Sequence, residues 1–451
     1  MTHTSFTRHI TSNLFLLILS LALLPFTTPL TLVHYLRAKR RQPLPILPQN
    51  RKTFLISNPY MTKSLHIIRT LSQAGHRVIT ISTTLLPPAG ALSRHSSQHF
   101  VVNASSKSTY ESELLDIALQ TRCDAWIPVS GVQGADLDAA VAETLRSKAG
   151  IKVCAPTSEQ VRCLDDKASF INLCRKLELD VPETVEIRDV QSAVAVLHSP
   201  DIEASMKRYI VKCTSMDDTE RGDMTLLPKP SPESTDAFLR KKLAGEKARK
   251  TWVLQEYVGP PAKEYATHAV VSCGRIVAFV TVEGGEMVMR YRVVRGSISQ
   301  ALRNWTQKLV EGLNVREGHV SCDFLVRKDP GKPMRVCAIE CNPRVHTAMV
   351  VMKSDRIVEG YMDMFKEESA AEQVTSFEDG IDDERWWVAH ELLTNPLGIM
   401  SGKDAEFDAM DPIPWWWAYH VWWPLVFLQS LWRGKRWSRI NVSTGKVFQS
   451  G

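Results

Sequence analysis

The segment from residue 52 to residue 82 restricts the possible fold more than any other part of the sequence. A short apolar strand (KTFLIS) is followed by a stretch in which Leu65, Ile68 and Leu71 recur at helical spacing, and then by an alternating strand (RVITIS). Gly75 marks the end of the helix. A strand, a helix and a strand in so short a space form a βαβ unit, because parallel strands need a crossover connection. The sequence therefore predicts a parallel sheet here.

At 451 residues the chain is too long for one hydrophobic core, so several domains are expected. The parallel pattern continues through a helix at residues 110–120 and a strand at residues 124–129. It predicts a small doubly wound domain over residues 50–155. The first turn of this domain lacks the G-x-G-x-x-G fingerprint, so a dinucleotide cofactor is not expected.

Beyond this domain the pattern changes to α+β. A helix at residues 165–177 precedes several strands, and two of them, 319–326 and 335–341, form an antiparallel hairpin around a polar turn. We expect this second domain to cover residues 156–366. Residues 367–451 begin as an acidic, Ser-rich linker and continue as a Trp-rich segment. The predicted fold is thus multidomain, α/β followed by α+β.

The N-terminal part, residues 1–42, contains an uncharged run at residues 14–36 that is long enough to cross a hydrocarbon core. Basic residues follow at once, and the positive-inside rule then places the rest of the chain in the cytosol. We therefore expect a single-pass membrane protein with a transmembrane helix and a cytosolic catalytic domain. A cleaved secretory signal is the alternative, disfavoured because no A-x-A site follows the run. The basic residues are Arg37, Lys39, Arg40 and Arg41.

Residues 414–437 hold seven of the twelve tryptophans and end in basic residues. Tryptophan favours the headgroup layer of a membrane, and lysine and arginine favour anionic lipid. We interpret the segment as interfacial or re-entrant. A helix packed on the catalytic domain with its indoles buried is the alternative, and a second full crossing is the weakest option because Pro424 divides the run.

Composition excludes some functions. The net charge of +6 is modest and no basic stripe or nucleic-acid motif accompanies it, so nucleic acid is not an expected partner. The nine cysteines form no CxxC pair and no cluster at zinc spacing, which is typical of reduced thiols in the cytosol.

Five elements appear in an order that suits ATP binding: Lys167, Lys212, residues 255–264, Asp323, and the run Glu340-Cys-Asn342-Pro-Arg344. ATP requires cations on its phosphates, an apolar slot for adenine and oxygen ligands for magnesium. Glu340 and Asn342 lie two apart on one strand, so their side chains share a face of the sheet. The side chain of Asp323 on the partner strand can converge with them on one cation. Each residue taken singly is more often structural, and the ordered set is far more specific.

These residues identify a resemblance. The chain resembles the ATP-grasp superfamily over about residues 52–365, and it looks most like the group of ligases that form mycosporine-glycine in cyanobacteria. The matching stretches are MTKSLHIIRTLSQAGHRVI, LDDKASFINLCRKLELDVPET, WVLQEYVGPPAKEYATHAVV and AIECNPRVHTAM. The hydrophobic N-terminal segment fits that group as well.

The resemblance implies a role for each residue. Lys167 and Lys212 would bind the nucleotide phosphates, and Glu264 would bind the ribose hydroxyls. Arg344 would stabilise the phosphoryl group in transfer and His346 would lie near the acid substrate. The adenine hinge would be Glu256, Tyr257 and Val258, and the magnesium ligands would be Asp323, Glu340 and Asn342, with Mn²⁺ as a possible substitute.

One stretch departs from the superfamily pattern. The glycine-rich phosphate loop expected after the second lysine is CTSMDDTERGDMTLLP, in which Gly222 is the single glycine. Close relatives also lack glycines there, so activity is not excluded. Arg290 and Arg292 follow the middle strands on the side where acid substrates bind, and we take them as candidate substrate anchors.

The expected reaction is ATP-dependent ligation in secondary-metabolite biosynthesis. ATP with magnesium phosphorylates a carboxylate or a vinylogous acid, and an amine or amino acid then displaces phosphate, releasing ADP. Three alternatives remain: another ATP-grasp carboxylating or phosphorylating reaction, a kinase that releases the acyl phosphate, and a membrane scaffold on a degenerate fold. The sequence leaves the acid, the amine and the oligomeric state open.

Overall fold

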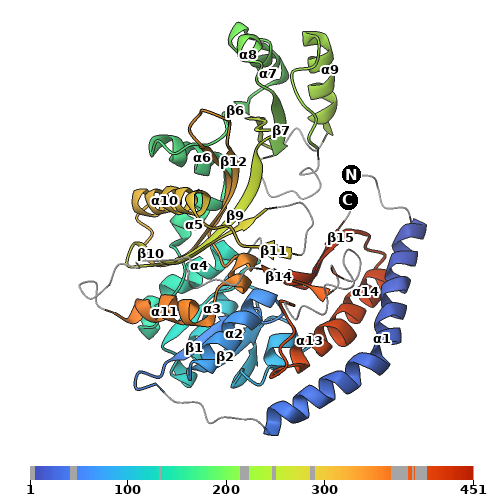
Figure 1. Ribbon diagram of the computed structural model, residues 1–451, viewed down its shortest axis with the longest axis vertical. Coiled ribbons are helices and arrows are strands. Elements are labelled where there is room, and N and C mark those ends of the chain that lie inside the picture. The colour runs from blue at the N-terminus through green and yellow to red at the C-terminus, as the bar shows by residue number, and fades with distance from the viewer. Residues whose placement is uncertain are drawn as a thin grey trace.

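The structure is a computed structural model of the chain, and it describes residues 6–40, 48–131, 134–213, 223–245, 250–284, 290–366, 384–388, 391 and 404–449. Figure 1 shows a helical rim at the lower right, a parallel sheet with its helices at the bottom, an antiparallel sheet in the middle and a small helix-covered sheet at the top. The predicted linker at residues 367–383 lies outside the described residues.

The N-terminal sheet is parallel, and its five strands have the order β3-β2-β1-β4-β5. The βαβ prediction is confirmed: β1 and β2 are adjacent parallel strands in which Thr53 pairs with Arg77, and the helix α2 connects them. The strand order reverses between β1 and β4, and in open α/β sheets such a switch point opens a crevice at the carboxyl edge. The elements are β1 (Thr53–Ser57), α2 (Thr62–Gln73), β2 (Arg77–Ser82), η1 (Ala89–Leu92), β3 (Gln98–Val101), α3 (Lys107–Thr121), β4 (Ala125–Ile127), α4 (Ala135–Thr144), η2 (Leu145–Ala149) and β5 (Lys152–Val153).

The helix predicted at residues 165–177 begins at Lys167, and a separate helix that was not predicted ends just before it at Asp165. Asp166 lies between the two helices with an extended backbone, and its carboxylate caps the second helix by accepting a hydrogen bond from the Ser169 amide at 2.8 Å. An aspartate competes with the helical backbone and favours such N-cap positions, which is why the helix restarts here. The break makes Lys167 the first residue of the second helix. The two helices are α5 (Ser158–Asp165) and α6 (Lys167–Lys176).

A three-stranded sheet of order β6-β8-β7 follows and is covered by short helices at the top of Figure 1. Its strands are antiparallel, so Lys212 pairs with Val253 and Tyr209 with Glu256. The elements are β6 (Thr184–Ile187), α7 (Val190–Leu197), α8 (Pro200–Ser205), β7 (Tyr209–Cys213), α9 (Pro232–Lys242) and β8 (Trp252–Glu256).

The central sheet is antiparallel with the order β10-β9-β12-β13. Most residues of its long strands are buried, so both faces of the sheet are covered, one of them by the apolar stripe of the amphipathic helix α10. Trp305 of that helix packs edge-on against Phe324 with ring centroids 5.1 Å apart. The elements are β9 (Lys263–Ser272), β10 (Arg275–Glu283), β11 (Arg290–Arg292), α10 (Ser297–Gly312), β12 (Gly318–Arg327), β13 (Arg335–Asn342), η4 (Thr347–Val351), α11 (Ser354–Met362) and η5 (Asp363–Phe365).

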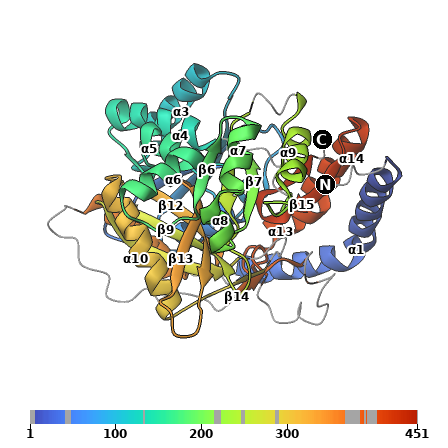
Figure 2. The same cartoon turned by 90° about the horizontal axis from the view of Figure 1, so that it is seen from above.

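The predicted apolar segment is one long, bent helix, α1 (Phe6–Arg40), which continues through Pro25 and Pro29. Within the described residues it is the one helix long and apolar enough to cross a membrane, a test that core helices and signal sequences also pass. Figure 2 shows α1 curving along the outside of the molecule beside α14.

The Trp-rich segment packs against both α1 and the N-terminal sheet. Trp415 and Trp423 are buried, and Trp423 joins the same core as strands of the N-terminal and central sheets, whereas Trp432 is 93% exposed. The segment thus contributes to the folded body and also presents an indole to the outside. The helices of this segment are α13 (Ile413–Trp417), η8 (Ala418–Trp422) and α14 (Trp423–Trp432), and the other C-terminal elements are β14 (Glu384–Trp386), β15 (Trp437–Asn441), η9 (Val442–Thr444) and β16 (Lys446–Gln449).

A buried ion pair fastens residues 404–411 to helix α2. Arg69 donates to Asp411 Oδ2 at 2.9 Å and to the Glu406 carbonyl at 2.7 Å, and both charged side chains are less than one-tenth exposed. Arg69→Met removes the counter-charge of a buried carboxylate, so we expect a loss of about 3–5 kcal/mol in the free energy of unfolding.

Urea unfolding followed by tryptophan fluorescence measures this loss. Arg356→Met is the matched control, because Arg356 pairs with Glu359, which is 63% exposed, and such pairs contribute less than about 1 kcal/mol. Equal losses in the two variants would show that the Arg69 pair does not hold the C-terminal segment in place.

Candidate active site

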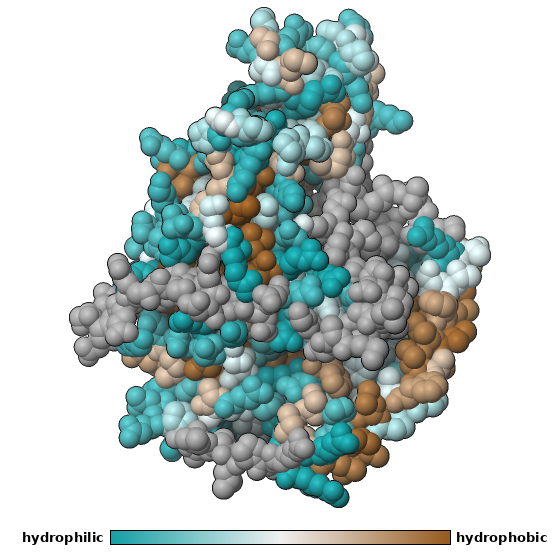
Figure 3. Space-filling view, in the orientation of Figure 1, coloured by the Kyte–Doolittle hydropathy of each residue, from teal (hydrophilic) through white to brown (hydrophobic). Residues whose placement is uncertain are grey.

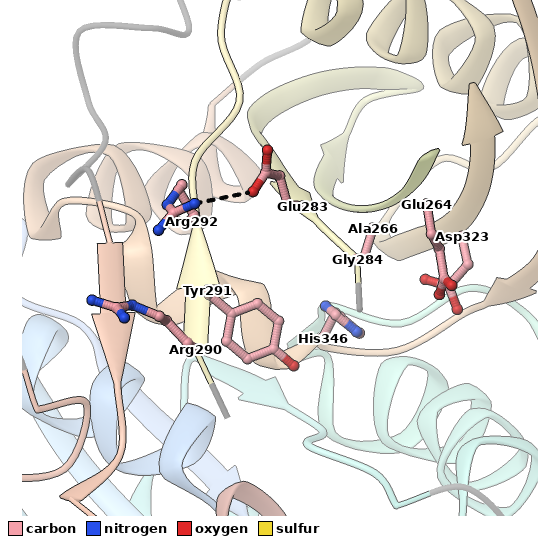
Figure 4. A pocket seen from close by; sticks show the side chains of 9 residues that line it. All are labelled: Glu264, Ala266, Glu283, Gly284, Arg290, Tyr291, Arg292, Asp323 and His346. Atoms are coloured by element: carbon pink, nitrogen blue, oxygen red, sulfur yellow. Dashed lines mark ion pairs between the residues drawn. The ribbon is translucent and has the colours of Figure 1, made fainter. Parts of the chain in front are cut away.

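Two acidic residues lie opposite each other on adjacent strands of the central sheet. Asp323 of β12 is the direct cross-strand partner of Glu340 of β13, beside a bulge in the register. Glu264 comes from the neighbouring strand β9, where it pairs with Leu325. Figure 4 shows the carboxylates of Glu264 and Asp323 side by side at one end of a cavity. Three acidic side chains from three strands thus meet at one place on the sheet.

The electrostatics of this group are unfavourable without a cation. Burial raises the pKa of Asp323 well above its ordinary value, and the neighbouring Glu340 and Glu264 raise it further. Asp323 and Glu340 are hydrogen-bonded to each other. The positive charge of Arg344 lowers the pKa of Asp323 and so opposes these effects. Carboxyl oxygens gathered in this way are the hard donors that magnesium prefers.

The donor set fits a magnesium ion that is shared with a nucleotide. Among the described residues, no group of three or more His, Cys, Asp or Glu side chains is arranged to hold a metal ion by itself. Magnesium is usually held by one or two carboxylates together with phosphate oxygens, so Asp323 and Glu340 would be sufficient protein ligands if a nucleotide is bound. Asn342 Oδ1 accepts a hydrogen bond from Arg344, so as a ligand it would use its remaining lone pair.

Arg344 connects the carboxylate group to the helix that begins at Lys167. Its guanidinium donates to Asp165 Oδ1 at 3.0 Å, and its side chain is 10% exposed. Asp165 is the last residue of α5 and lies two positions before Lys167. The structure therefore brings the predicted arginine and the start of α6 to the same end of the central sheet.

A cavity of about 340 Å³ adjoins the carboxylates and is lined by Glu264, Ala266, Glu283, Gly284, Arg290, Tyr291, Arg292, Asp323 and His346. Successive residues of β11 point to opposite sides, as in any strand. In Figure 4 Tyr291 points toward His346, while Arg290 and Arg292 point away from Asp323. Arg290 is paired with Glu384 at 3.2 Å, and Arg292 with Glu283 at 3.5 Å. Both proposed anchors thus lie at the rim, already engaged by carboxylates.

His346 is a neutral side chain inside this cavity. Its Nδ1 accepts a hydrogen bond from the Ala348 amide at 3.1 Å, which leaves the proton on Nε2. Burial lowers its pKa to about 3, with further contributions from the positive charges of Lys63 and Arg344. The ring of Tyr291 meets it edge-on at 6.0 Å, and burial raises the pKa of that phenol to about 12. Both groups therefore stay uncharged at neutral pH and act as hydrogen-bond donors.

The predicted adenine hinge is partly occupied by protein contacts. The Glu256 amide donates to the Glu183 carbonyl and the Tyr257 amide to the Arg208 carbonyl, each at 2.7 Å. The Glu256 side chain receives two hydrogen bonds from Arg335, at 2.8 and 3.0 Å. Of the three hinge amides, that of Val258 is therefore the donor we propose for adenine.

Lys212 lies on β7, and its Nζ approaches the sulfur of Met224 at 3.4 Å. Residues 214–222, which contain most of the departing phosphate loop and Gly222, are outside the described residues. The structure thus places Lys212 near the end of β7 in the small upper sheet and Lys167 at the start of α6.

Sequence reasoning missed Lys63, a buried lysine at the first turn of α2. Its Nζ donates to the Val345 carbonyl and to the Ser130 carbonyl, and it is 5% exposed. It thereby links the carboxyl edge of the N-terminal sheet to the backbone between Arg344 and His346. Its position at the start of the helix that follows the first strand of a βαβ unit was the available signal, since ligand-binding residues gather at that edge of the sheet.

The burial of Lys63 predicts a pH dependence. Burial lowers the pKa of Lys63 to about 7, and the positive charges of Arg344 and Lys446 add to this effect. The unfolded chain therefore binds one more proton than the folded chain between pH 7 and about pH 10, and stability contributed by this group rises with pH in that window.

We expect Lys63→Met to remove this rise, so that its stability relative to the unmodified protein falls from pH 7 to pH 9. Denaturant unfolding at three pH values measures the difference, with the exposed Lys176→Met as control. A difference that is constant with pH would show that Lys63 keeps its proton in the folded state.

No protein-family model matches the sequence, and no curated protein matches it. Solved structures do match the fold. One is an ADP complex of purK, N5-carboxyaminoimidazole ribonucleotide synthetase, with 14% identity over 71% of this chain and 78% of that one and a TM-score of 0.51. A second is the biotin carboxylase domain of a thermophilic 2-oxoglutarate carboxylase bound to bicarbonate (12% identity, 75% and 73% covered, TM-score 0.53).

A third is the biotin carboxylase domain dimer of Hydrogenobacter thermophilus 2-oxoglutarate carboxylase with MgADP, ADP and bicarbonate (13% identity, 74% and 73% covered, TM-score 0.52). These neighbours are ATP-grasp enzymes, and they match most of the chain at identities that establish the fold alone. The carboxylate pair, the adjoining arginine and the two preceding lysines therefore lie on a chain that has the ATP-grasp fold.

Proposed function

We propose that this protein is an ATP-dependent ligase that activates an acid by phosphorylation and couples it to an amine. The observation that supports this most directly is the pairing of Asp323 with Glu340 beside Arg344, on the central sheet of an ATP-grasp fold. Bound magnesium, held by Asp323, Glu340 and Asn342, would supply charge neutralisation on the nucleotide phosphates.

The nucleotide would lie between the upper and central sheets. Lys167 and Lys212 would bind its phosphates, Val258 its adenine and Glu264 its ribose, although Glu264 also adjoins Asp323. One acid oxygen attacks the γ-phosphorus, the bond to the bridging oxygen breaks and ADP leaves. Arg344 is positioned to stabilise the charge of the transferring group.

In the second step the amine nitrogen attacks the activated carbon, phosphate leaves with the bonding electrons, and the amine loses a proton. His346 and Tyr291 are uncharged donors in the cavity and would orient the acid there. The cavity of about 340 Å³ suits a small molecule rather than a macromolecule.

The substrate class follows from the sequence resemblance. The resemblance to the mycosporine-glycine-forming group favours a vinylogous acid as the first substrate and an amino acid as the second, within secondary metabolism. We further propose that α1 attaches the enzyme to a membrane with its catalytic site in the cytosol. All nine cysteines are free thiols, which is consistent with that compartment.

A comparison of metabolites tests the proposal. Extract from a producing host that lacks this gene is incubated with the purified protein, MgATP and mixed amino acids, and ADP and new adducts are measured by mass spectrometry. We expect ADP and a new amine adduct in equal amounts. ADP formation that needs bicarbonate instead of amine would indicate carboxylation, and ADP without any adduct would indicate a kinase.

The proposed phosphate contact of Lys212 predicts a binding defect. Lys212→Ala removes a charge-assisted contact made already in the ground state, so we expect nucleotide affinity to fall roughly 10- to 100-fold with a smaller change in kcat. Calorimetric titration with ADP and magnesium measures this. Lys207→Ala, which removes a half-exposed lysine paired with Glu183 just before the same strand, should bind normally. A Lys212 variant with normal affinity would remove this residue from the nucleotide site.

A further inference from the structure

Helices α1 and α14 pack against each other, and each carries large apolar side chains that no described part of the chain covers. Phe15, Ile18, Leu21 and Phe26 of α1 are 61–74% exposed, and Leu428 and Trp432 of α14 are 50% and 93% exposed. We call these six residues the apolar band. Figure 3 shows hydrophobic residues gathered over α1 at the lower right edge of the molecule. Exposed apolar surfaces of this kind mark contacts with a membrane or another protein.

Helix α1 is bound to the folded body along most of its length. Asn13 Oδ1 accepts from Trp437 Nε1 at 3.1 Å near one end, and the Ala38 carbonyl accepts from Arg94 at 3.3 Å near the other. The helix between them measures about 37 Å at 1.5 Å per residue. This exceeds the roughly 30 Å of a hydrocarbon core. A crossing by α1 would therefore either break these contacts or draw the folded body into the bilayer.

Three polar side chains in the middle of α1 are hydrogen-bonded to the folded body. Ser20 Oγ donates to the Tyr419 carbonyl at 2.9 Å, and Thr28 Oγ1 accepts from Trp416 Nε1 at 3.0 Å. The two ring nitrogens of His420 lie within 3.1 Å of Ser20 Oγ and 2.7 Å of Thr27 Oγ1. These hydrogen bonds hold the middle of α1 to α13 and η8, while the apolar band remains exposed on the helix surface.

Basic residues lie at both ends of this surface. Arg8 precedes the band, Arg37 and Arg40 follow it on α1, and Arg433 and Arg436 follow α14. Residues 6–40 contain no acidic residue. A crossing helix would place its two basic ends on opposite sides of the bilayer. A helix lying in the membrane plane places all of them in one headgroup layer, where each contributes attraction to anionic lipid.

We infer that α1 and α14 together dock on one leaflet of an anionic membrane, with α1 in the membrane plane, and that α1 does not cross the bilayer. The occupant of the apolar band is thus the acyl and headgroup region of that leaflet. The exposed indole of Trp432 lies where an interfacial tryptophan is expected. This inference concerns the mode of attachment and is independent of the reaction proposed above.

Protease access to an N-terminal epitope tag tests the orientation. The full-length tagged protein is expressed, and sealed membrane vesicles with the catalytic domain outward are treated with protease. In-plane docking predicts that the tag is digested without detergent. A tag that is protected until detergent is added would show that α1 crosses, and would overturn the inference.

A thiol cross-link between α1 and η8 tests whether their contact persists on the membrane. Ser20→Cys combined with His420→Cys should be joined by a short bifunctional thiol reagent in the vesicle-bound protein, because the parent side chains are in contact. The two single variants serve as controls. Cross-linking in detergent that is absent from the vesicle-bound protein would show that α1 leaves the body to insert, again contradicting in-plane docking.

Substitutions in the band test which surface binds. Phe15→Glu, Ile18→Glu and Phe26→Glu together should lower sedimentation of the purified protein with phosphatidylcholine–phosphatidylglycerol vesicles more than 10-fold. Leu85→Glu with Leu119→Glu is the matched control, because these residues are 90% and 53% exposed on other elements. Unchanged sedimentation of the triple variant would overturn the inference, as would a band-dependent dimer that excludes vesicles.

Discussion

Glu340→Gln is expected to lower magnesium-dependent ADP formation by about 10³-fold or more while the protein stays folded. Glu340 faces Asp323 directly, and together they present the carboxylate oxygens at the centre of the site. A neutral amide keeps the shape of the side chain but cannot offset the charge of a divalent cation, so the cation and the phosphates it neutralises are lost together.

The substitution leaves folding intact for a specific reason. Removing one of several crowded carboxylates relieves repulsion in the absence of metal, since Glu340 raises the pKa of Asp323. We therefore expect Glu340→Gln to be at least as resistant to thermal unfolding as the unmodified protein without magnesium. Glu311→Gln, an exposed substitution on α10, is the control for activity. Near-normal turnover in folded Glu340→Gln would remove the metal assignment from this pair.

Arg344→Ala is expected to lower kcat roughly 10²- to 10³-fold with a much smaller change in the affinity for ATP. An arginine that meets charge developing during phosphoryl transfer stabilises the transition state more than the ground state, so its loss appears mainly in kcat. Rapid measurement of ADP formation at saturating ATP, together with nucleotide titration, separates the two quantities.

Arg344 also forms an ion pair with Asp165, so the prediction for Arg344→Ala needs a control for the loss of this contact. Asp165 accepts from Arg344 at 3.0 Å, so loss of the arginine could act by displacing α5 and the start of α6. Asp165→Asn keeps a hydrogen-bond acceptor and should retain most activity. Arg327→Ala, which removes a partly exposed arginine paired with Asp329, should be neutral. If Arg344→Ala loses only nucleotide affinity, the arginine is a binding group and another residue stabilises the transition state.

The sequence by itself determined the parts of the fold that depend on local pattern. Strand periodicity placed Glu340 and Asn342 on one face, and the polar turn made the pairing of β12 with β13 antiparallel. The pairing of Asp323 with Glu340 also needs the bulge next to Asp323, because the uninterrupted register would put Asp323 opposite Ile339. The βαβ unit was equally readable, because a crossover helix between adjacent strands leaves the parallel arrangement as its outcome. Both features rest on interactions between residues near one another in the chain.

The choice among the residues of β11 required the tertiary structure. The sequence singled out Arg290 and Arg292, whereas the structure turns Tyr291 toward His346. A strand fixes which residues share a face but not which face looks inward. Which face of β11 points into the cavity is decided here by its pairing with β14. Trp386 of β14 lies opposite Arg290 and is distant from it in sequence.

The contacts of Lys63 and of the Trp-rich segment also could not be predicted from the sequence, because their partners are distant in the chain. The partners of Lys63 are carbonyls of Ser130 and Val345, which only the folded chain brings to it. Hydrophobic composition marked residues 14–36 and 414–437 as membrane-seeking, and their mutual contacts came from the tertiary structure alone. Composition measures how much apolar surface an element carries. Which side of that surface meets protein is settled by long-range packing, because the hydrophobic effect has no preferred direction.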